Sequence, residues 1–168
     1  MRKTSLWMCV LLLLSLPAVT KAGNEQEKNK AVARSFFEEV IDQGRLDKYA
    51  DSHAPDFVVH GRTHDATLAE DMAAASEERK ALPDMRLKIN QMVAEGDLVA
   101  VSWTASGTNT HEGMGFPATG KKITVPGMTI FRFKNGKIIE EWGVFDMWSA
   151  VQQAGLCAPP PQPTPPRS

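Results

Sequence analysis

The spacing of apolar residues changes at Pro83, and this change restricts the fold class of the chain. Before Pro83 apolar residues recur at helical intervals, whereas after it they alternate with polar residues as in strands. Helices followed by strands with short turns are typical of an α+β domain. We therefore expect three N-terminal helices packed on a strongly curved, four-stranded antiparallel sheet (a cone or half-barrel), followed by a short C-terminal helix.

Three helices are predicted ahead of Pro83. The first covers 25–43 and ends at Gly44, and its apolar residues form one stripe: Val32, Phe36, Phe37, Val40 and Ile41. The others cover 45–52 and 67–81, with a brief extended segment at 57–60 between them. Phe36 and Met72 belong to the apolar stripes, so we expect them to face the sheet and to line a binding site.

Four strands are predicted after Pro83, over 85–93, 98–108, 121–133 and 137–145. The pair Asn135-Gly136 is a strong hairpin signal between the last two strands. Residues 147–154 predict a short helix, which Gly155 closes. A curved sheet covered by helices leaves an apolar cavity between the two layers, which is a common form of small-molecule site.

The two ends of the chain differ from this domain. Residues 1–22 are typical of a secretory signal peptide, because Arg2 and Lys3 precede an apolar run and Ala22 ends a small-residue cleavage site. An uncleaved N-terminal anchor is the alternative. Residues 158–168 hold six of the 11 prolines, which favours an extended spacer over a ligand for an aromatic groove. We expect a domain over 23–157 in a secreted or periplasmic protein, without stable membrane insertion after cleavage.

The charge balance argues against nucleic acid as a partner. The chain has 19 basic and 20 acidic residues, whereas nucleic-acid-binding domains carry a basic excess on one face. Of the two cysteines, Cys9 lies in the predicted signal peptide, which leaves Cys157 alone in the mature chain. The fold is therefore expected to hold without an internal disulfide.

Asp146 is the strongest candidate for chemistry. A regular period of two places Trp142, Val144 and Asp146 on one face of the last strand. Apolar surroundings there would raise the pKa of Asp146 toward the range of a general acid/base. Because Asp146 directly precedes a predicted helix, an N-cap role is the alternative. Glu141 falls on the opposite face, where we expect it to be solvated.

Two histidines and one tryptophan are further candidates. His60 follows an apolar segment and either points into the cavity as a hydrogen-bond donor or is satisfied at a strand end. His111 lies in the long connection over 109–120 and could form part of a lid, and Trp103 is either a core aromatic or a pocket wall. His60 and His64 lack the shared helical face of a zinc pair, so we expect no metal. The sequence has no phosphate-binding or dinucleotide-binding loop, so no cofactor is expected.

The sequence resembles the SnoaL-like polyketide cyclase (ester cyclase) family, within the group that shares the fold of nuclear transport factor 2. The resemblance covers about 29–155. It rests on these segments: Phe57-Val58-Val59-His60-Gly61, Gly107-Thr108, 115–121, Phe131-Arg132-Phe133, 136–146 and Gln153-Ala154-Gly155.

The resemblance implies cofactor-free acid/base chemistry. In the family an aspartate at the position of Asp146 deprotonates a carbon flanked by carbonyls, the enolate closes a ring by intramolecular aldol addition, and the acid returns a proton. The resemblance also implies that His60 and Trp142 orient the substrate. Asn109 stands where the family often has a histidine, so the donor at that position is changed.

These features predict an exported enzyme that acts on a small apolar carbonyl compound by cyclisation or isomerisation. The alternative is a non-catalytic carrier or sensor that holds a lipophilic ligand in the same cavity. The exposed back of the sheet also offers a surface on which a second copy of the chain could form a homodimer.

Overall fold

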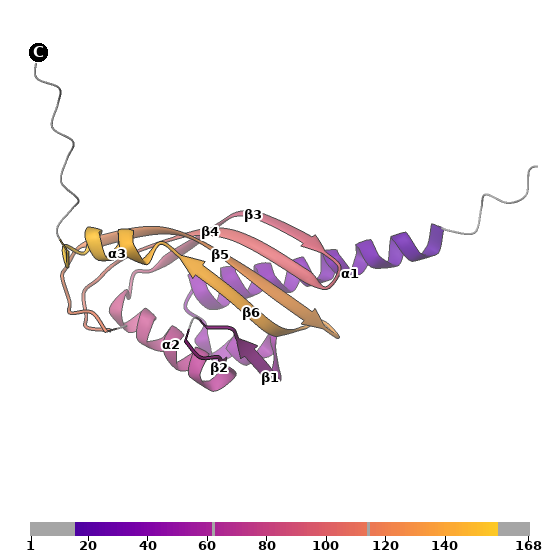
Figure 1. The fold of residues 1–168 in the computed structure, drawn as a ribbon, viewed down its shortest axis with the longest axis horizontal. Helices are drawn as coiled ribbons and strands as arrows, with labels where there is room; N and C mark the ends of the chain where they lie inside the picture. Colours follow the sequence, from indigo (N-terminus) through magenta and orange to yellow (C-terminus); the bar gives the residue numbers. More distant parts are fainter. Residues whose placement is uncertain (1–15, 62, 114, 158–168) are drawn as a thin grey trace, which may run out of the picture.

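The computed structural model describes residues 16–61, 63–113 and 115–157 (Figure 1). The apolar run of the predicted signal peptide, up to residue 15, and the proline-rich segment 158–168 lie outside the described residues. The helices are α1 (Leu16–Ser35), η1 (Phe36–Asp42), η2 (Leu46–Asp51), α2 (Leu68–Ala81) and α3 (Met147–Gln153). The strands are β1 (His53–Val59), β2 (Ala66–Thr67), β3 (Arg86–Glu95), β4 (Leu98–Thr108), β5 (Lys122–Lys134) and β6 (Lys137–Phe145). Within the described ranges, no helix is both long and apolar enough to cross a membrane.

The α+β class is confirmed, but the sheet has six strands in the order β2-β1-β6-β5-β4-β3 rather than four. The extended segment predicted at 57–60 belongs to β1, which pairs in parallel with β6 and antiparallel with β2. The sheet is therefore mixed. The prediction found only the end of β1 and missed β2, because β1 contains Pro55 and β2 has only two residues, so neither shows a clear alternating pattern.

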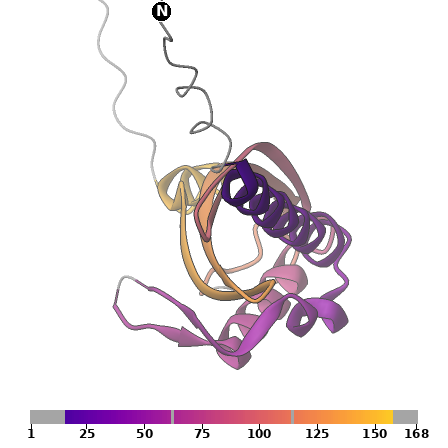
Figure 2. The same cartoon turned by 90° about the vertical axis from the view of Figure 1, so that its right-hand side faces the viewer.

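The sheet curls, and α1 and α2 lie on its concave side (Figure 2). Register shifts in β3, between Ile89 and Gln91, and in β6, at Ile139, each insert one extra residue into a strand pair. Such bulges bend a strand and increase its twist, which contributes to the curvature.

The first predicted helix is present, but it begins at Leu16 rather than at residue 25, and its hydrogen bonding changes along its length. Residues 36–42 form a π-helix, η1, directly after α1. A π-helix is wider than an α-helix, so adjacent residues can both point toward the core. Phe36 and Phe37 are each only 4% exposed.

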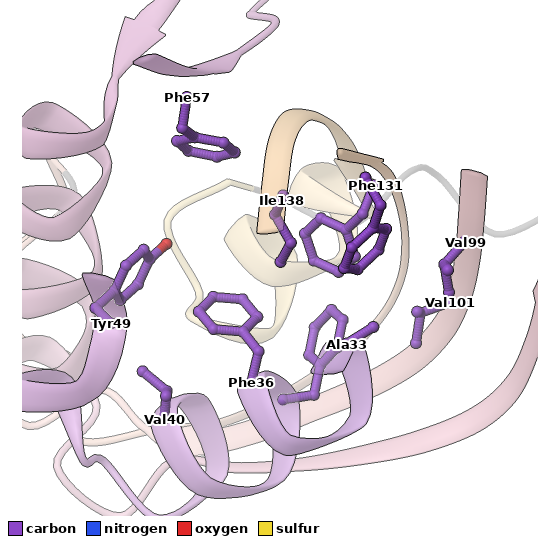
Figure 3. Close-up of a cluster of buried hydrophobic side chains, with 11 residues drawn as sticks. Ala33, Phe36, Val40, Tyr49, Phe57, Val99, Val101, Phe131 and Ile138 are labelled. Atoms are coloured by element: carbon purple, nitrogen blue, oxygen red, sulfur yellow. The ribbon is translucent and has the colours of Figure 1, made fainter. Parts of the chain in front are cut away.

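The core lies where η1 meets the concave face (Figure 3). Phe36 packs edge-on against Tyr49 and Phe131, with ring centroids 5.0 and 5.9 Å apart. His53 joins this cluster: its ring stacks on Tyr49, and its Nδ1 lies 2.9 Å from the Tyr49 carbonyl oxygen. Burial lowers the pKa of His53 to about 4, so this histidine is neutral at physiological pH.

Candidate active site

A bulge in β6 determines which side chains reach the concave face. Arg132 pairs with Glu140 and Phe133 with Ile138, so Ile139 is the extra residue. One extra residue moves every later side chain of a strand to the opposite face. Beyond the bulge the concave face carries Glu141, Gly143 and Phe145, and the convex face carries Glu140, Trp142 and Val144. The expected inward position of Trp142 and Val144 is therefore wrong, and Val144 is 69% exposed.

Glu141 lies on the concave side of the sheet. The expectation that it is solvated is therefore wrong. A Cβ added at Gly143 would lie 3.5 Å from Glu141 Oε1 and 3.9 Å from Thr129 Oγ1, so the carboxylate lies beside Gly143, the residue that pairs with Thr129. Thr129 is itself buried and accepts a hydrogen bond of 3.1 Å from Trp103 Nε1. Burial, reinforced by the charge of Asp71, raises the pKa of Glu141 to about 8, so this side chain is mostly protonated at neutral pH.

Asp71 on α2 is a second interior acid. The buried Tyr49 donates its hydroxyl hydrogen to Asp71 Oδ2. A capping box fixes the start of α2, because the Thr67 side chain accepts from the backbone N–H of Glu70 and the Glu70 carboxylate accepts from that of Thr67. Burial raises the pKa of Asp71, and the hydrogen bond from Tyr49 opposes that rise. Burial also raises the pKa of Tyr49, with further contributions from the charges of Asp71 and Glu141.

Glu78 lies in the wall of a pocket at the end of the sheet near α3. The pocket and the open space at its mouth together measure about 570 Å³. Apart from Glu78 and Asn109, its lining consists of apolar residues and glycine, drawn from α2, the β4–β5 connection, β5, the end of β6 and α3: Leu82, Gly113, Phe116, Ile123, Val125, Phe145, Met147, Ala150, Val151, Ala154 and Leu156. Burial raises the pKa of Glu78, and the nearby Arg79 opposes this shift. The wall therefore combines apolar surface with one ionisable group.

Asp146 caps α3. Its Oδ1 accepts a hydrogen bond of 2.9 Å from the backbone N–H of Ser149, so the N-cap alternative is confirmed. Its side chain is exposed. The expectation that apolar residues surround it is therefore wrong. Its neighbours in the sequence, Phe145 and Met147, both line the pocket, but Asp146 itself is not among the lining residues. No hydrogen bond within the described ranges uses its Oδ2.

His60 and Trp142 contact each other on the convex side of the sheet, away from the pocket. Their rings stack with centroids 4.7 Å apart at an angle of 17°. His60 Nε2 lies 3.4 Å from Glu140 Oε1, and Nδ1 lies 3.3 Å from Asp65 Oδ2. Arg132 lies over Trp142, with its guanidinium carbon 5.3 Å from the centre of the Trp142 ring. The expectation that His60 points into the cavity is wrong, and the histidine is satisfied at the strand end.

The other predicted residues divide between the pocket, the core and the surface. Asn109 lines the pocket, but its side chain holds the β4–β5 connection: Nδ2 donates to the His111 carbonyl, and Oδ1 accepts from the backbone and hydroxyl of Thr119. His111 is exposed in that connection. Phe36 is a core residue, and the half-buried Met72 packs against the core; neither lines the pocket.

Four interior groups were not predicted, namely Tyr49, Asp71, Glu78 and Glu141. A signal for two of them exists in α2, because Asp71, Ala75 and Glu78 follow the i, i+4, i+7 spacing of one helical face. That face packs toward the sheet through Ala75, so acids with this spacing are candidates for burial. In the part of the chain that the structure describes, no three histidine, cysteine, aspartate or glutamate side chains are grouped to hold a metal ion.

Comparisons with known proteins agree with this architecture. The family model described as SnoaL-like polyketide cyclase matches residues 31–154. No curated protein sequence is significantly similar to the chain.

Crystal structures of several proteins share the fold. AclR from Streptomyces galilaeus, a candidate hydroxylase, has a TM-score of 0.75 at 25% identity, over 82% of this chain and 91% of AclR. IdmH from Streptomyces antibioticus, a candidate polyketide cyclase, has a TM-score of 0.66 at 26% identity, over 76% of this chain and 98% of IdmH. A candidate polyketide cyclase from Acidithiobacillus ferrooxidans has a TM-score of 0.67 at 26% identity, over 78% of this chain and 96% of that protein. The described domain therefore corresponds to nearly the whole length of these proteins.

Proposed function

The chain belongs to the SnoaL-like polyketide cyclase family, and on this premise we propose that it is a cyclase- or isomerase-type enzyme that moves protons within a small apolar carbonyl compound. The observation that carries the proposal is the end pocket, whose otherwise apolar lining includes the ionisable residue Glu78. An apolar pocket with few convergent polar groups is the usual form of a small-molecule site. Such a wall favours a ligand with apolar rings or chains over a highly charged one.

Glu78 is the proposed acid/base group of the pocket. Burial raises its pKa, so it is a stronger base than a solvated carboxylate and lies closer to the pH at which it would work. Its carboxylate removes a proton from a carbon between two carbonyl groups, which leaves an enolate. In a cyclisation the enolate carbon attacks a second carbonyl of the same molecule, and the resulting alkoxide takes up a proton from the protonated Glu78. In an isomerisation Glu78 returns the proton to a different atom of the enolate.

Asp146 is the second proton-transfer group that we propose, because the family resemblance assigns the base to this position. The two residues next to it in the sequence, Phe145 and Met147, line the pocket, which is compatible with that role. The hydrogen bond from Ser149 holds Oδ1 in place, and Oδ2 can still accept a proton. His60 and Trp142 form no part of this proposal, since they lie on the convex side.

The test compares Glu78→Gln and Asp146→Asn with Glu77→Gln, which changes an exposed carboxylate one residue away on the same helix. The probe is a synthetic aromatic polyketone ester with an activated methylene, and its conversion is followed by liquid chromatography and mass spectrometry. Loss of the acid/base group should lower kcat by about 10²–10⁴-fold with a smaller change in KM, and the control should keep wild-type turnover. Unchanged kcat in both pocket variants would refute the acid/base proposal. Binding of the probe without any product would favour the carrier alternative.

We also propose that the protein is exported, on the basis of the residue pattern over 1–22. Cleavage after Ala22 would give a mature protein that begins at Gly23. N-terminal sequencing of the protein from the culture medium or periplasm tests this. An uncut chain in the membrane fraction would instead support the anchor alternative, and an uncut chain in the cytosol would refute export.

A further inference from the structure

Trp103 packs against the core on the concave face, next to the lining of the end pocket but not part of it. Along β5 the alternate residues Val125, Gly127 and Thr129 share one face: Val125 lines the pocket, and Thr129 pairs with Gly143, which the Glu141 carboxylate approaches. Gly127, between them, lies directly under the Trp103 ring. A Cβ added at Gly127 would lie 2.2, 2.3 and 2.7 Å from Cζ2, Cη2 and Cε2 of Trp103. The indole therefore rests on the backbone of β5, where only glycine leaves it room.

The register of the sheet places the same ring next to the pocket wall. Trp103 pairs directly with Gly127, and Gly127 pairs with Phe145, which lines the pocket. The hydrogen bond of 3.1 Å from Trp103 Nε1 to Thr129 Oγ1 fixes the other edge of the indole. Two residues along a strand span about 7 Å. Gly143 lies two residues before Phe145 in β6, so these two residues are only about 7 Å apart. The Glu141 carboxylate approaches Gly143, on the far side of the indole from Phe145.

Helix α2, on the opposite wall, also carries one residue at the pocket and one acid farther along the interior. Glu78 lines the pocket, and Asp71 lies seven residues earlier, which is about 10 Å along the helix axis. Between them, on the same helical face, Ala75 contributes only a methyl group. The charge of Asp71 acts on both Glu78 and Glu141, so all three acids share one interior. One acid thus lies at the pocket and two lie beyond Trp103.

We propose that Trp103 is a specificity-determining residue that closes the inner end of the pocket and limits the length of the ligand. We expect a three-ring carbonyl or phenolic compound to need the space that the indole fills, and a two-ring compound to bind without it. A ligand that extended past this position would place its far oxygen atoms next to Glu141 and the hydrogen-bonded pair of Tyr49 and Asp71. The inference rests on the proposed function only in taking the end pocket as the ligand site.

The first test measures ligand length. Two probes, 1,3-dihydroxynaphthalene with two fused rings and 1,3-dihydroxyanthraquinone with three, are titrated against wild type and Trp103→Ala by calorimetry. The variant should bind the three-ring probe at least about tenfold more tightly than wild type does, because one more ring is buried. Affinity for the two-ring probe should change by less than about threefold. Trp148→Leu, which alters an exposed tryptophan of α3 outside the pocket lining, is the matched control and should leave both affinities unchanged.

Equal affinity of wild type and Trp103→Ala for the three-ring probe would overturn the proposal. If Trp103→Ala does not fold, Trp103→Leu takes its place, and a smaller gain for the same probe is the expected result. A loss of affinity for both probes would assign Trp103 to ligand contact and would likewise overturn its role as the end of the pocket.

A second test needs neither ligand nor turnover. The pKa of Glu141 is followed by carbon-13 NMR of its carboxyl group in the free protein. Removing the indole connects Glu141 to the open pocket, so water reaches it and its pKa should fall from about 8 toward the ordinary value of 4.5. An unchanged pKa would overturn the placement of Trp103 between the two. Both measurements stay readable if the protein turns over no substrate, so failure of the proposed enzyme activity is separate from failure of this inference.

Discussion

Replacing Glu141 by Gln tests the position of this acid directly, through the pH dependence of stability. In the folded protein the pKa of Glu141 is about 8, against an ordinary value of 4.5. Between these two pH values the folded protein holds a proton that the unfolded chain has released. The free energy of unfolding therefore falls as the pH rises, by about 1.4 kcal/mol per pH unit. The contribution of Glu141 is complete below pH 4.5 and is lost as the pH approaches 8, which amounts to about 3 kcal/mol by neutral pH.

Gln fills nearly the same space and cannot ionise, so the variant lacks this component of the pH dependence. Urea unfolding, followed by tryptophan fluorescence at several pH values from 4.5 to neutral, gives the free energy of unfolding of both proteins. The stability of Glu141→Gln relative to wild type should rise by about 3 kcal/mol over that range. Glu95→Gln, at an exposed position of β3, should show no such relative rise. A constant difference between Glu141→Gln and wild type would refute the buried position of Glu141.

Three further substitutions test the packing around the site, each by urea unfolding. Gly127→Ala should lower the free energy of unfolding by about 1–3 kcal/mol, because its methyl group would meet the Trp103 ring. Gly143→Ala should lower it much less, because the added methyl group has no neighbour closer than 3.5 Å. Equal losses in the two variants would contradict the close contact between Gly127 and Trp103. Thr67→Ala should cost about 1 kcal/mol through loss of the α2 cap, and an unchanged stability would show that the capping box contributes nothing. Tyr49→Phe should lower the free energy of unfolding by about 1–3 kcal/mol. It should also raise the pKa of Asp71 further, because the hydrogen bond from the Tyr49 hydroxyl lowers that pKa. An unchanged pKa of Asp71, measured by NMR, would refute this hydrogen bond.

Local patterns were enough to predict the elements that local sequence controls. The strands predicted at 98–108 and 137–145 have these bounds in the structure, and the helix predicted at 67–81 is α2, which starts directly after Thr67. The turn at Asn135-Gly136 is also confirmed, with φ of 53° and 74°, the left-handed conformations that a tight hairpin turn needs.

Strand β1 was predicted only as a short extended segment because its pairing is set by distant residues. It lies between helices in the sequence, and its partner β6 follows about eighty residues later. Parallel pairing leaves no turn signal, since the connection passes through the rest of the domain. The burial of His53 follows from this pairing, and so does the position of His60 at the strand end on the convex side.

The face of β6 was predicted wrongly for a physical reason that also bears on function. Two phases of alternation were possible after Gly136, and the more apolar one, with Trp142 and Val144, was expected inside. The bulge at Ile139 reverses this choice: Trp142 faces outward, where His60 and Arg132 cover it, and Glu141 faces inward. Burying a carboxyl group in place of an indole is unfavourable. The unfavourable free energy is smaller when the carboxyl group is neutral, and Glu141 stays protonated. Departures of this kind from the hydrophobic pattern are expected at functional or strained sites.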